Sequence, residues 1–297
     1  MSTTTALPSR ARLWLLAARP KTLTASLGGV LVGTALGARD GVLRLDAFAA
    51  TVLVAVGLQI AANLYNDYGD FVRGADDAGR LGPARAVANG WLTPHAVRLG
   101  ALVAIAVATV AGLYLVRLVG WPALAIGAAA IVSALAYTAG PYPLAYVGLG
   151  DLFVVGFFGV VAVTGSALVH AGRVSRETWL ASFAVGALAN AILVVNNVRD
   201  REGDTRARKR TLVVRFGERF GRLEYTAMLV LGYGIAVVGA LAFARPGWVL
   251  PLLTLPFAWT LARRMKTRTG AELNRELELT AQLGLAFDAL LALGGAL

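Results

Sequence analysis

Cysteine is absent from the 297 residues, and histidine occurs only at His95 and His170. Disulfides and thiolate metal sites are therefore excluded, and too few imidazoles remain for the usual zinc or haem sites. The sequence also lacks G-x-x-x-x-G-K-[ST] and a G-x-G-x-x-G after a strand. The usual sequence evidence for nucleotide hydrolysis and dinucleotide binding is therefore missing.

Charge is scarce as well, because 15% of the residues are charged and 57% are apolar, whereas soluble domains carry about 25% charged residues. A membrane core of about 30 Å needs about 20 apolar residues per helix. We therefore predict an all-α polytopic membrane protein with one domain, residues 1–297. Nine apolar runs predict nine transmembrane helices: 22–38, 47–66, 97–116, 119–138, 147–169, 178–197, 225–244, 247–262 and 279–297.

The basic residues predict the orientation, because lysine and arginine accumulate in cytoplasmic loops. Most of the 28 lysines and arginines fall in residues 10–21, 73–98, 199–222 and 263–275. With nine helices, this places the N-terminus in the cytoplasm and the C-terminus outside, in a plasma (inner) membrane. Contact with anionic membrane lipid explains the net charge of +11. Nucleic-acid binding would need a soluble basic domain, and the chain leaves no room for one.

Carboxylates and amides gather at the cytoplasmic ends of two runs, where we expect two polar loops to begin. Each group starts with the spacing Asn-x-x-x-Asp, and residues four apart lie on one face of a helix. Each group should therefore present stacked oxygen atoms in one direction. The first group is Asn66, Asp67, Asp70 and Asp76, and the second is Asn196, Asp200 and Asp204.

These acids predict a metal and diphosphate site, because a carboxylate inside the membrane costs up to about 3 kcal/mol without a partner or a wet cavity. Oxygen ligands without nearby histidine or cysteine favour Mg²⁺, which is usually shared with substrate phosphates. The alternative is a salt-bridge network with neighbouring arginines. The expected metal ligands are Asp67, Asp70, Asp76, Asp200 and Asp204; Asp70 and Asp200 should be central to catalysis, and Asn66 and Asn196 should contact substrate.

Basic side chains flank both groups and suit a diphosphate substrate. Guanidinium groups match phosphate oxygens with two parallel hydrogen bonds, while lysine acts as a point charge. For Arg85 and Lys209, the alternative role of an ordinary inner-loop anchor stays open. The expected phosphate-binding residues are Arg73, Arg80, Arg85, Arg199 and Lys209.

Four segments resemble the UbiA-type intramembrane prenyltransferases, and within them the 1,4-dihydroxy-2-naphthoate polyprenyltransferases of menaquinone synthesis. They are NDYGDFVRGAD (66–76), RLGPARAVANG (80–90), AYTAGPYPLAYVGLGD (136–151) and NNVRDREGDTRARKRTLVVRFG (196–217). ELNRELELTAQLGLAF (272–287) is also similar, so the likeness covers nearly the whole chain. Gly74 stands where the hydroxybenzoate branch has an acid, which argues against that branch.

The resemblance implies nine helices around a central cavity, with Mg²⁺ and a polyprenyl diphosphate bound at the two Asp-rich motifs. The diphosphate would leave with help from the metal, and the resulting allylic cation would attack the ring of 1,4-dihydroxy-2-naphthoate, which loses its carboxylate. Aromatic faces stabilise cations, so we expect Tyr65, Tyr68 and Tyr137 to line the reactive end, with Tyr137 closest to the chemistry. Tyr142 is a further candidate, although Tyr142 and Tyr146 fit an interfacial aromatic belt better.

Two alternatives remain at this point. The same diphosphate chemistry could serve another aromatic acceptor, such as 4-hydroxybenzoate or homogentisate. An ion-coupled transporter could also use intramembrane acids, but it would place them near mid-span in discontinuous helices. Asp288, inside the last run, is the acid that fits a transporter better, and we assign it no role.

Overall fold

The computed structural model describes residues 9–74, 81–82, 85–137 and 143–297. Every regular element in this part of the chain is helical. Three residues of the sequence-based predictions, Asp76, Arg80 and Tyr142, lie outside the described residues.

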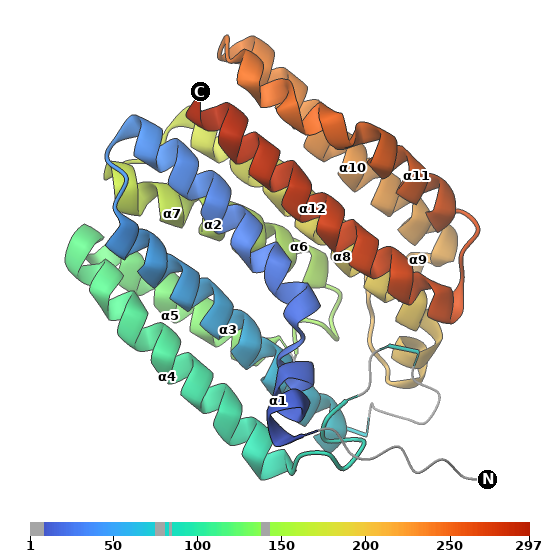
Figure 1. Cartoon of the computed structure of the whole chain (residues 1–297). Helices are drawn as coiled ribbons and strands as arrows, with labels where there is room; N and C mark the ends of the chain where they lie inside the picture. The colour runs from blue at the N-terminus through green and yellow to red at the C-terminus, as the bar shows by residue number, and fades with distance from the viewer. Residues whose placement is uncertain (1–8, 75–80, 83–84, 138–142) are drawn as a thin grey trace.

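Each predicted apolar run coincides with a helical segment (Figure 1). Two of the segments change helix type along their length. The segments are α2 (Pro20–Asp40), α3 (Leu45–Val72), α4 (Pro94–Val119), α5 (Trp121–Ala136), α6 (Gly150–Val154) with η1 (Val155–Val161) and α7 (Ala162–Ala171), α8 (Arg176–Arg206), α10 (Glu218–Ala242), η2 (Pro246–Thr254) with α11 (Leu255–Met265), and α12 (Leu273–Ala296). Short helices α1 (Arg10–Ala18), α9 (Leu212–Phe216) and η3 (Gly270–Glu272) complete the described elements.

Six helices of the described chain are long and apolar enough to cross a membrane: α3, α4, Gly150–Ala171, α8, α10 and Gly270–Ala296. Crossing by α2, α5 and η2–α11 stays a prediction. α5 has 16 residues, which span about 24 Å at 1.5 Å per residue and fall short of a full membrane core. Pro251 lies inside η2, where it removes a backbone donor and favours the tighter helix seen there.

The described residues of both Asp-rich motifs are helical, although the motifs were expected to open loops. Asn66 and Asp70 lie in the last turns of α3, and residues 196–204 lie inside α8, which continues to Arg206. Local pairing explains this extension, because Arg199 bonds the side chain of Asn196 one turn earlier. Both rows of oxygen atoms are therefore carried by regular helix, as their spacing requires.

α8 forms the centre of the helical packing. It contacts α10, η1, α12, α2 and α7, and its middle residues Ala181, Val185, Leu188 and Val194 are buried. α2 lies against both α7 and α12 (Figure 1). A Cβ added at Gly33 would come within 2.2 Å of the Val163 carbonyl oxygen, so α2 can approach α7 this closely only with glycine there.

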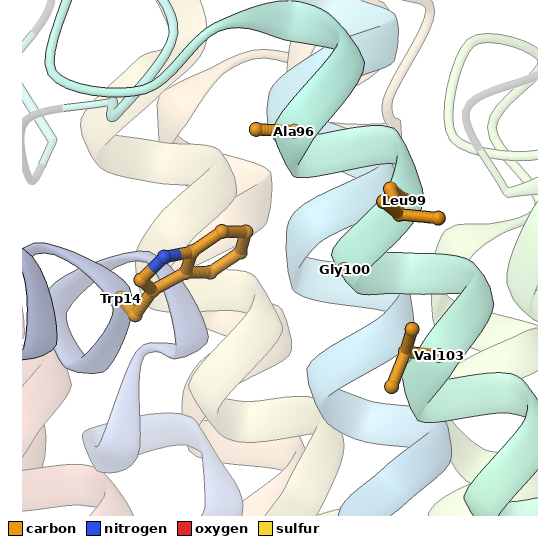
Figure 2. A pocket seen from close by; sticks show the side chains of 5 residues that line it. All are labelled: Trp14, Ala96, Leu99, Gly100 and Val103. Carbon is orange, nitrogen blue, oxygen red and sulfur yellow. The ribbon is translucent and has the colours of Figure 1, made fainter.

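The N-terminal helix α1 rests on α4 through Trp14. Ser9 caps α1 by accepting a hydrogen bond from the backbone N–H of Arg12. Only Arg19 separates α1 from α2, which begins at Pro20. A small apolar pocket between Trp14 and α4 is lined by Trp14, Ala96, Leu99, Gly100 and Val103 (Figure 2). A Cβ added at Gly100 would lie 2.6 Å from the Trp14 ring. The bare glycine therefore lets the indole pack against α4.

Candidate active site

A cavity of about 680 Å³ opens among α2, α3, α4, α5, α6–η1–α7 and α8. One part of its wall is polar and contains both Asp-rich motifs. Asn66 and Asp70 reach it from α3, and Asn196, Asp200 and Asp204 reach it from α8. The two rows of oxygen atoms therefore face one shared space.

Lys209 joins the two motifs directly. Its Nζ lies 3.3 Å from Asp70 Oδ1 and 3.9 Å from Asp204 Oδ1. The turn after α8 positions this amine, because the N–H of Lys209 donates to the Asp204 carbonyl over 2.8 Å. A single cation thus interacts with one carboxylate from each motif, which brings α3 and α8 together at the polar end of the cavity.

Asp70 is the most heavily engaged acid of the site. Its side chain is 2% exposed and accepts from Arg85 Nη2 at 2.6 Å and from the hydroxyl of Tyr146 at 3.1 Å. Arg85 lies in the 85–92 segment and is itself 5% exposed. A buried ion pair of this kind repays its desolvation only with good geometry and additional hydrogen bonds, and both are present at Asp70.

Asp67 supports the loop that carries Arg85. Its Oδ2 accepts from the backbone N–H of Ala86 at 2.9 Å, so this carboxylate fixes the start of the 86–90 turn. Asp67 is 2% exposed, and its other oxygen, Oδ1, has no hydrogen-bond partner in the described part of the chain. A role for Asp67 as metal ligand stays a prediction, and Oδ1 is the atom through which it would act.

The second motif is organised around Arg199, which is 4% exposed. Its guanidinium binds Asp200 with two hydrogen bonds, from Nε at 2.8 Å and from Nη2 at 2.6 Å. Nη2 also donates to Asn196 Oδ1 at 2.6 Å. Arg199 therefore holds the side chains of Asn196 and Asp200 on the cavity side, where it also contributes positive charge.

Asn274 was not identified from the sequence. It lies at the start of α12, accepts from Arg199 Nη1 at 2.9 Å and donates to the Leu81 carbonyl oxygen at 2.8 Å. It therefore connects the second motif to the segment that follows the first. One sequence feature could have pointed to Asn274: it lies in the charged segment ELNRELE, residues 272–278, which precedes the last apolar run.

Tyr146 is the second residue that was not selected for the site, because its expected location was an interfacial aromatic belt. Its ring lies under two cations, with Lys209 Nζ 5.0 Å and Arg73 Cζ 5.5 Å from the ring centroid. Burial, and then the nearby Asp70 carboxylate, raises the pKa of Tyr146, so its hydroxyl stays protonated and donates to Asp70. The predicted topology could have pointed to Tyr146, because it places the loop before residue 147 on the same side of the membrane as both motifs.

The other predicted tyrosines separate into two groups. Tyr137 lines the cavity, as expected. Tyr65 and Tyr68 pack against each other at 5.9 Å and against the buried cluster of Leu64, Ala86 and Val87. Tyr65 and Tyr68 are not among the described residues that line the cavity. Their expected place at the reactive end of the cavity is therefore not supported. Arg73 is exposed and reaches the site through the Tyr146 ring.

A polar strip that the sequence analysis did not single out continues the cavity wall between α2 and α3. Asn63 Nδ2 donates to Thr22 Oγ1 at 3.0 Å and to the Ala18 carbonyl at 2.9 Å. Gln59 donates to Thr22 and accepts from Ser26, both at 3.4 Å. All four side chains line the cavity, so hydrogen-bonding groups extend from the acidic end toward the apolar wall.

The acids and amides offer oxygen ligands only, which suits Mg²⁺. Within the described residues, however, no three carboxylate or imidazole side chains lie close enough to form a metal site by themselves. The carboxylates instead bind Arg85, Arg199 and Lys209. The donor set therefore fits an ion that is shared with a phosphate and with water, rather than one enclosed by protein ligands.

Comparisons of the sequence with known proteins identify its family. The model of the UbiA prenyltransferase family matches residues 26–283. The 1,4-dihydroxy-2-naphthoate octaprenyltransferase of Mycobacterium tuberculosis is 38% identical over 289 residues, covering 96% of each chain. The enzyme of the same name from Escherichia coli is 35% identical over 300 residues, again covering 96% of each chain.

The fold is similar to that of solved structures. A UbiA homolog from Archaeoglobus fulgidus bound to DMAPP and Mg²⁺ matches with a TM-score of 0.66 at 16% identity, over 94% of this chain and 98% of that chain. A UbiA homolog from Aeropyrum pernix K1 matches with a TM-score of 0.69 at 19% identity, over 93% and 97%. The sequence match, which covers most of the chain, shows that this integral membrane protein belongs to the UbiA prenyltransferase family.

Proposed function

We propose that this protein transfers a polyprenyl group from a polyprenyl diphosphate to 1,4-dihydroxy-2-naphthoate, with loss of the carboxylate, and so makes the reduced (quinol) form of a demethylmenaquinone. The observation that carries the proposal is the pairing of Asp70 and Asp204 through Lys209 at the polar part of a cavity that is otherwise largely apolar. A diphosphate headgroup suits the charged part, and a prenyl chain suits the rest. Relatives with this reaction in their names cover nearly the whole chain.

Three cations of the site are suited to hold the diphosphate. Arg85, Arg199 and Lys209 all line the cavity, and each is already held by a carboxylate. Such preorganised donors can stabilise developing charge without a cost of rearrangement during the reaction. Arg73 lies further out over Tyr146 and is suited to meet the incoming headgroup.

Asp70, Asp200 and Asp204, together with Asn66 and Asn196, are the residues that would hold Mg²⁺ against the diphosphate. When bound, Mg²⁺ acts as a Lewis acid that stabilises charge on the leaving group. Asp76 and Arg80 belong to the same proposal from the sequence alone. The chain itself positions the headgroup, because the two motifs lie on different helices and contact a common space.

The apolar wall protects the allylic cation that forms when the diphosphate leaves. Phe153, Phe157 and Phe158 line the cavity together with Leu58, Leu115 and Ile126. Aromatic faces stabilise cations, and a wall of apolar side chains keeps water from capturing the intermediate. Tyr137 lines the same cavity, and in this proposal it contacts the reacting carbon.

The protein would carry out this reaction in the plasma membrane of a bacterium, with the N-terminus and both Asp-rich motifs on the cytoplasmic side. The many basic residues next to these motifs support this orientation. The soluble diphosphate product would then leave on the side where the polar end of the cavity lies.

The acceptor is tested with purified protein in lipid nanodiscs. One prenyl diphosphate is supplied with 1,4-dihydroxy-2-naphthoate, 4-hydroxybenzoate or homogentisate, and the products are weighed by mass spectrometry. We expect prenylation with loss of CO₂ from the naphthoate and little product from the others. Selective prenylation of hydroxybenzoate or homogentisate would replace the proposed acceptor, and substrate-driven ion uptake into vesicles without any prenylated product would replace the enzyme class.

The metal site is tested by binding as well as by activity. Mn²⁺ can replace Mg²⁺ and be counted by electron paramagnetic resonance in the presence of a non-reactive diphosphate analogue. We expect Asp70→Ala and Asp200→Ala to remove bound Mn²⁺ and to abolish turnover, while Asp46→Ala, at the other end of α3, keeps both. Full Mn²⁺ binding in either site variant, or EDTA-resistant activity of the unaltered protein, would contradict the metal role.

A further inference from the structure

Three polar side chains from different helices meet outside the two Asp-rich motifs, and one of them lines the cavity. Asp151 of α6 lines the cavity, and its carboxyl interacts with the side chains of Asn190 of α8 and Glu224 of α10. Asn190 is 2% exposed. This three-residue cluster lies among otherwise apolar helices and needs an explanation.

Its hydrogen bonding is incomplete. Oδ1 of Asp151, Oδ1 of Asn190 and Oε2 of Glu224 are buried and have no hydrogen-bond partner in the described chain. Each such buried oxygen destabilises the fold when no donor satisfies it. These three oxygens are acceptors, and a ligand that brings a hydroxyl hydrogen to Oδ1 of Asp151 would supply that oxygen with a donor.

A purely structural role does not account for the cluster. An acid in the first turn of a helix is stabilised by the helix dipole, and Asp151 lies in the first turn of α6. That effect explains neither Asn190 nor a second carboxyl. Two carboxyls in contact share a proton, because two adjacent negative charges repel strongly in a medium of low dielectric constant. The cluster therefore retains one carboxylate able to accept a proton.

Tyr137 connects the cluster to the diphosphate site. Its side chain lines the same cavity as Asp151, Asp204 and Asp70. A Cβ added at Gly150 would lie 3.3 Å from the Tyr137 hydroxyl, so this hydroxyl also lies close to the start of α6. An aromatic ring beside Tyr137 could thus reach both Asp151 and the carbon released from the diphosphate.

An aromatic wall adjoins Asp151. Phe153 and Phe157 line the cavity, and their rings lie 5.8 Å apart at an interplanar angle of 18°. Phe157 belongs to η1, a π-helical segment, and such segments often occur at functional sites. A planar, polar-edged ligand fits a place where parallel rings stand next to a carboxyl group.

We propose that Asp151 binds the ring hydroxyl adjacent to the carboxylate of the aromatic acceptor and takes its proton during attack on the prenyl cation, with Asn190 and Glu224 positioning Asp151. This role rests on the proposed function. It assigns the acceptor to the side of the cavity formed by α6 and η1, away from the polar strip of Thr22 and Gln59 between α2 and α3.

In this reaction, Asp151 takes up one proton and later returns it. The allylic C–O bond breaks and its electron pair leaves with the diphosphate, and the ring carbon that bears the carboxylate forms a bond to the allylic carbon. As it does so, Asp151 takes the proton of the neighbouring hydroxyl, which becomes a ketone. CO₂ then leaves, its bonding electrons restore the aromatic ring, and the oxygen takes the proton back from Asp151. No net proton is gained or lost.

The test measures acceptor affinity and chemistry separately. Binding of 1,4-dihydroxy-2-naphthoate and of its 1-O-methyl and 4-O-methyl ethers is measured in nanodiscs with a non-ionisable prenyl thiodiphosphate present. We expect Asp151→Asn to weaken binding of the parent acid and of the 4-O-methyl ether by about tenfold, as for loss of one hydrogen bond to a charged group. Binding of the 1-O-methyl ether, which has no proton on the oxygen next to the carboxylate, should not change. Single-turnover prenylation of the parent acid should slow by about 10²-fold.

Glu224→Gln and Asn190→Leu should show the same pattern with smaller losses, because they act through Asp151. Asp288→Asn is the matched control, since Asp288 is another buried acid with an unpartnered oxygen but is not among the described cavity-lining residues. Equal weakening of all three ligands by Asp151→Asn, or an unchanged single-turnover rate, would overturn the proposal. Loss of thiodiphosphate binding would also overturn it, because Asp151 would then serve the donor.

The outcomes separate this inference from the proposed function. If the unaltered protein prenylates another hydroxylated aromatic acid, the proposed acceptor is wrong. The same three-ligand comparison is then made with that acid and its methyl ethers, and it decides the role of Asp151.

Discussion

Arg85 donates a hydrogen bond of 2.6 Å to Asp70 where both side chains are almost fully buried, at 5% and 2% exposure. The pair joins the loop after α3 to the first Asp-rich motif. A positive charge fixed at this depth can act on a diphosphate more strongly than a surface arginine, because the surroundings screen it less.

Arg85→Ala should therefore raise the Michaelis constant for the polyprenyl diphosphate by roughly 10-fold to 100-fold, the range expected for loss of a charge-assisted contact. The constant for the aromatic acceptor should change much less. Steady-state kinetics with each substrate varied in turn measure both. Arg275→Ala is the control, because the Arg275 side chain is 66% exposed and forms an ion pair with Glu278 at 4.0 Å. A larger effect on the acceptor would move Arg85 to the other substrate.

Lys209 provides the second prediction, since it contacts one acid of each motif. Lys209→Met keeps the length of the side chain but removes the charge, which leaves Asp70 and Asp204 repelling each other without a cation between them. We expect kcat/KM for the diphosphate to fall by about 10²-fold or more. We also expect a steeper dependence of the rate on Mg²⁺ concentration, since divalent ions would have to offset the lost charge.

Lys266→Met serves as the control for Lys209, because Lys266 is an exposed lysine after α11. Lys209→Arg should recover part of the activity. If Lys209→Met leaves both kcat/KM and the Mg²⁺ dependence unchanged, the contact between the two motifs has no part in diphosphate binding.

Helix positions and polar groups could be predicted from the sequence because apolar run length and Asn-x-x-x-Asp spacing are local properties. Helical periodicity could also have shown that Tyr65 and Tyr68 do not share the cavity face. At about 100° per residue, residue 68 lies about 200° around the helix from Asn66, whereas Asp70 returns to within about 40° of it. The tyrosines were placed by their distance along the chain, and the helix turns them toward the 85–92 segment.

The contacts of Tyr146 and Asn274 could not be predicted in the same way. Tyr146 meets Asp70 across 76 positions of sequence, and Asn274 meets Leu81 across 193. Such contacts depend on how α3, α8 and α12 pack, and no local pattern records that packing. The same holds for the meeting of Asp151, Asn190 and Glu224, which come from three helices.

Tyr146→Phe gives the third prediction, because it removes one hydroxyl and keeps the ring. The hydrogen bond to Asp70 would be lost, while the ring beneath Lys209 and Arg73 would remain. We expect a loss of about 1 kcal/mol in transition-state stabilisation, or roughly fivefold in kcat/KM, typical for one hydrogen bond. Tyr146→Leu removes the ring as well and should cost clearly more.

The comparison between the two Tyr146 variants is the informative measurement. Equal activity of the Phe and Leu variants would show that the ring does not help to hold the cations. Full activity of the Phe variant would show that Asp70 does not need the hydroxyl.

Asn274 gives the last prediction, and it tests whether α12 supports the second motif. Asn274→Leu removes the acceptor for Arg199 Nη1 and the donor to the Leu81 carbonyl, which leaves a buried guanidinium nitrogen without this partner. A lost bond to a charged group costs about 1.5–3 kcal/mol, so we expect a lower thermal unfolding temperature. The Michaelis constant for the diphosphate should also rise, because Arg199 would no longer hold Asp200 and Asn196 in place.

Arg275→Ala, one residue away and exposed, is the control and should change neither the unfolding temperature nor the Michaelis constant. A stable Asn274→Leu protein with unaltered diphosphate kinetics would mean that Asp200 and Asn196 alone fix Arg199, and that α12 contributes packing but no part of the site.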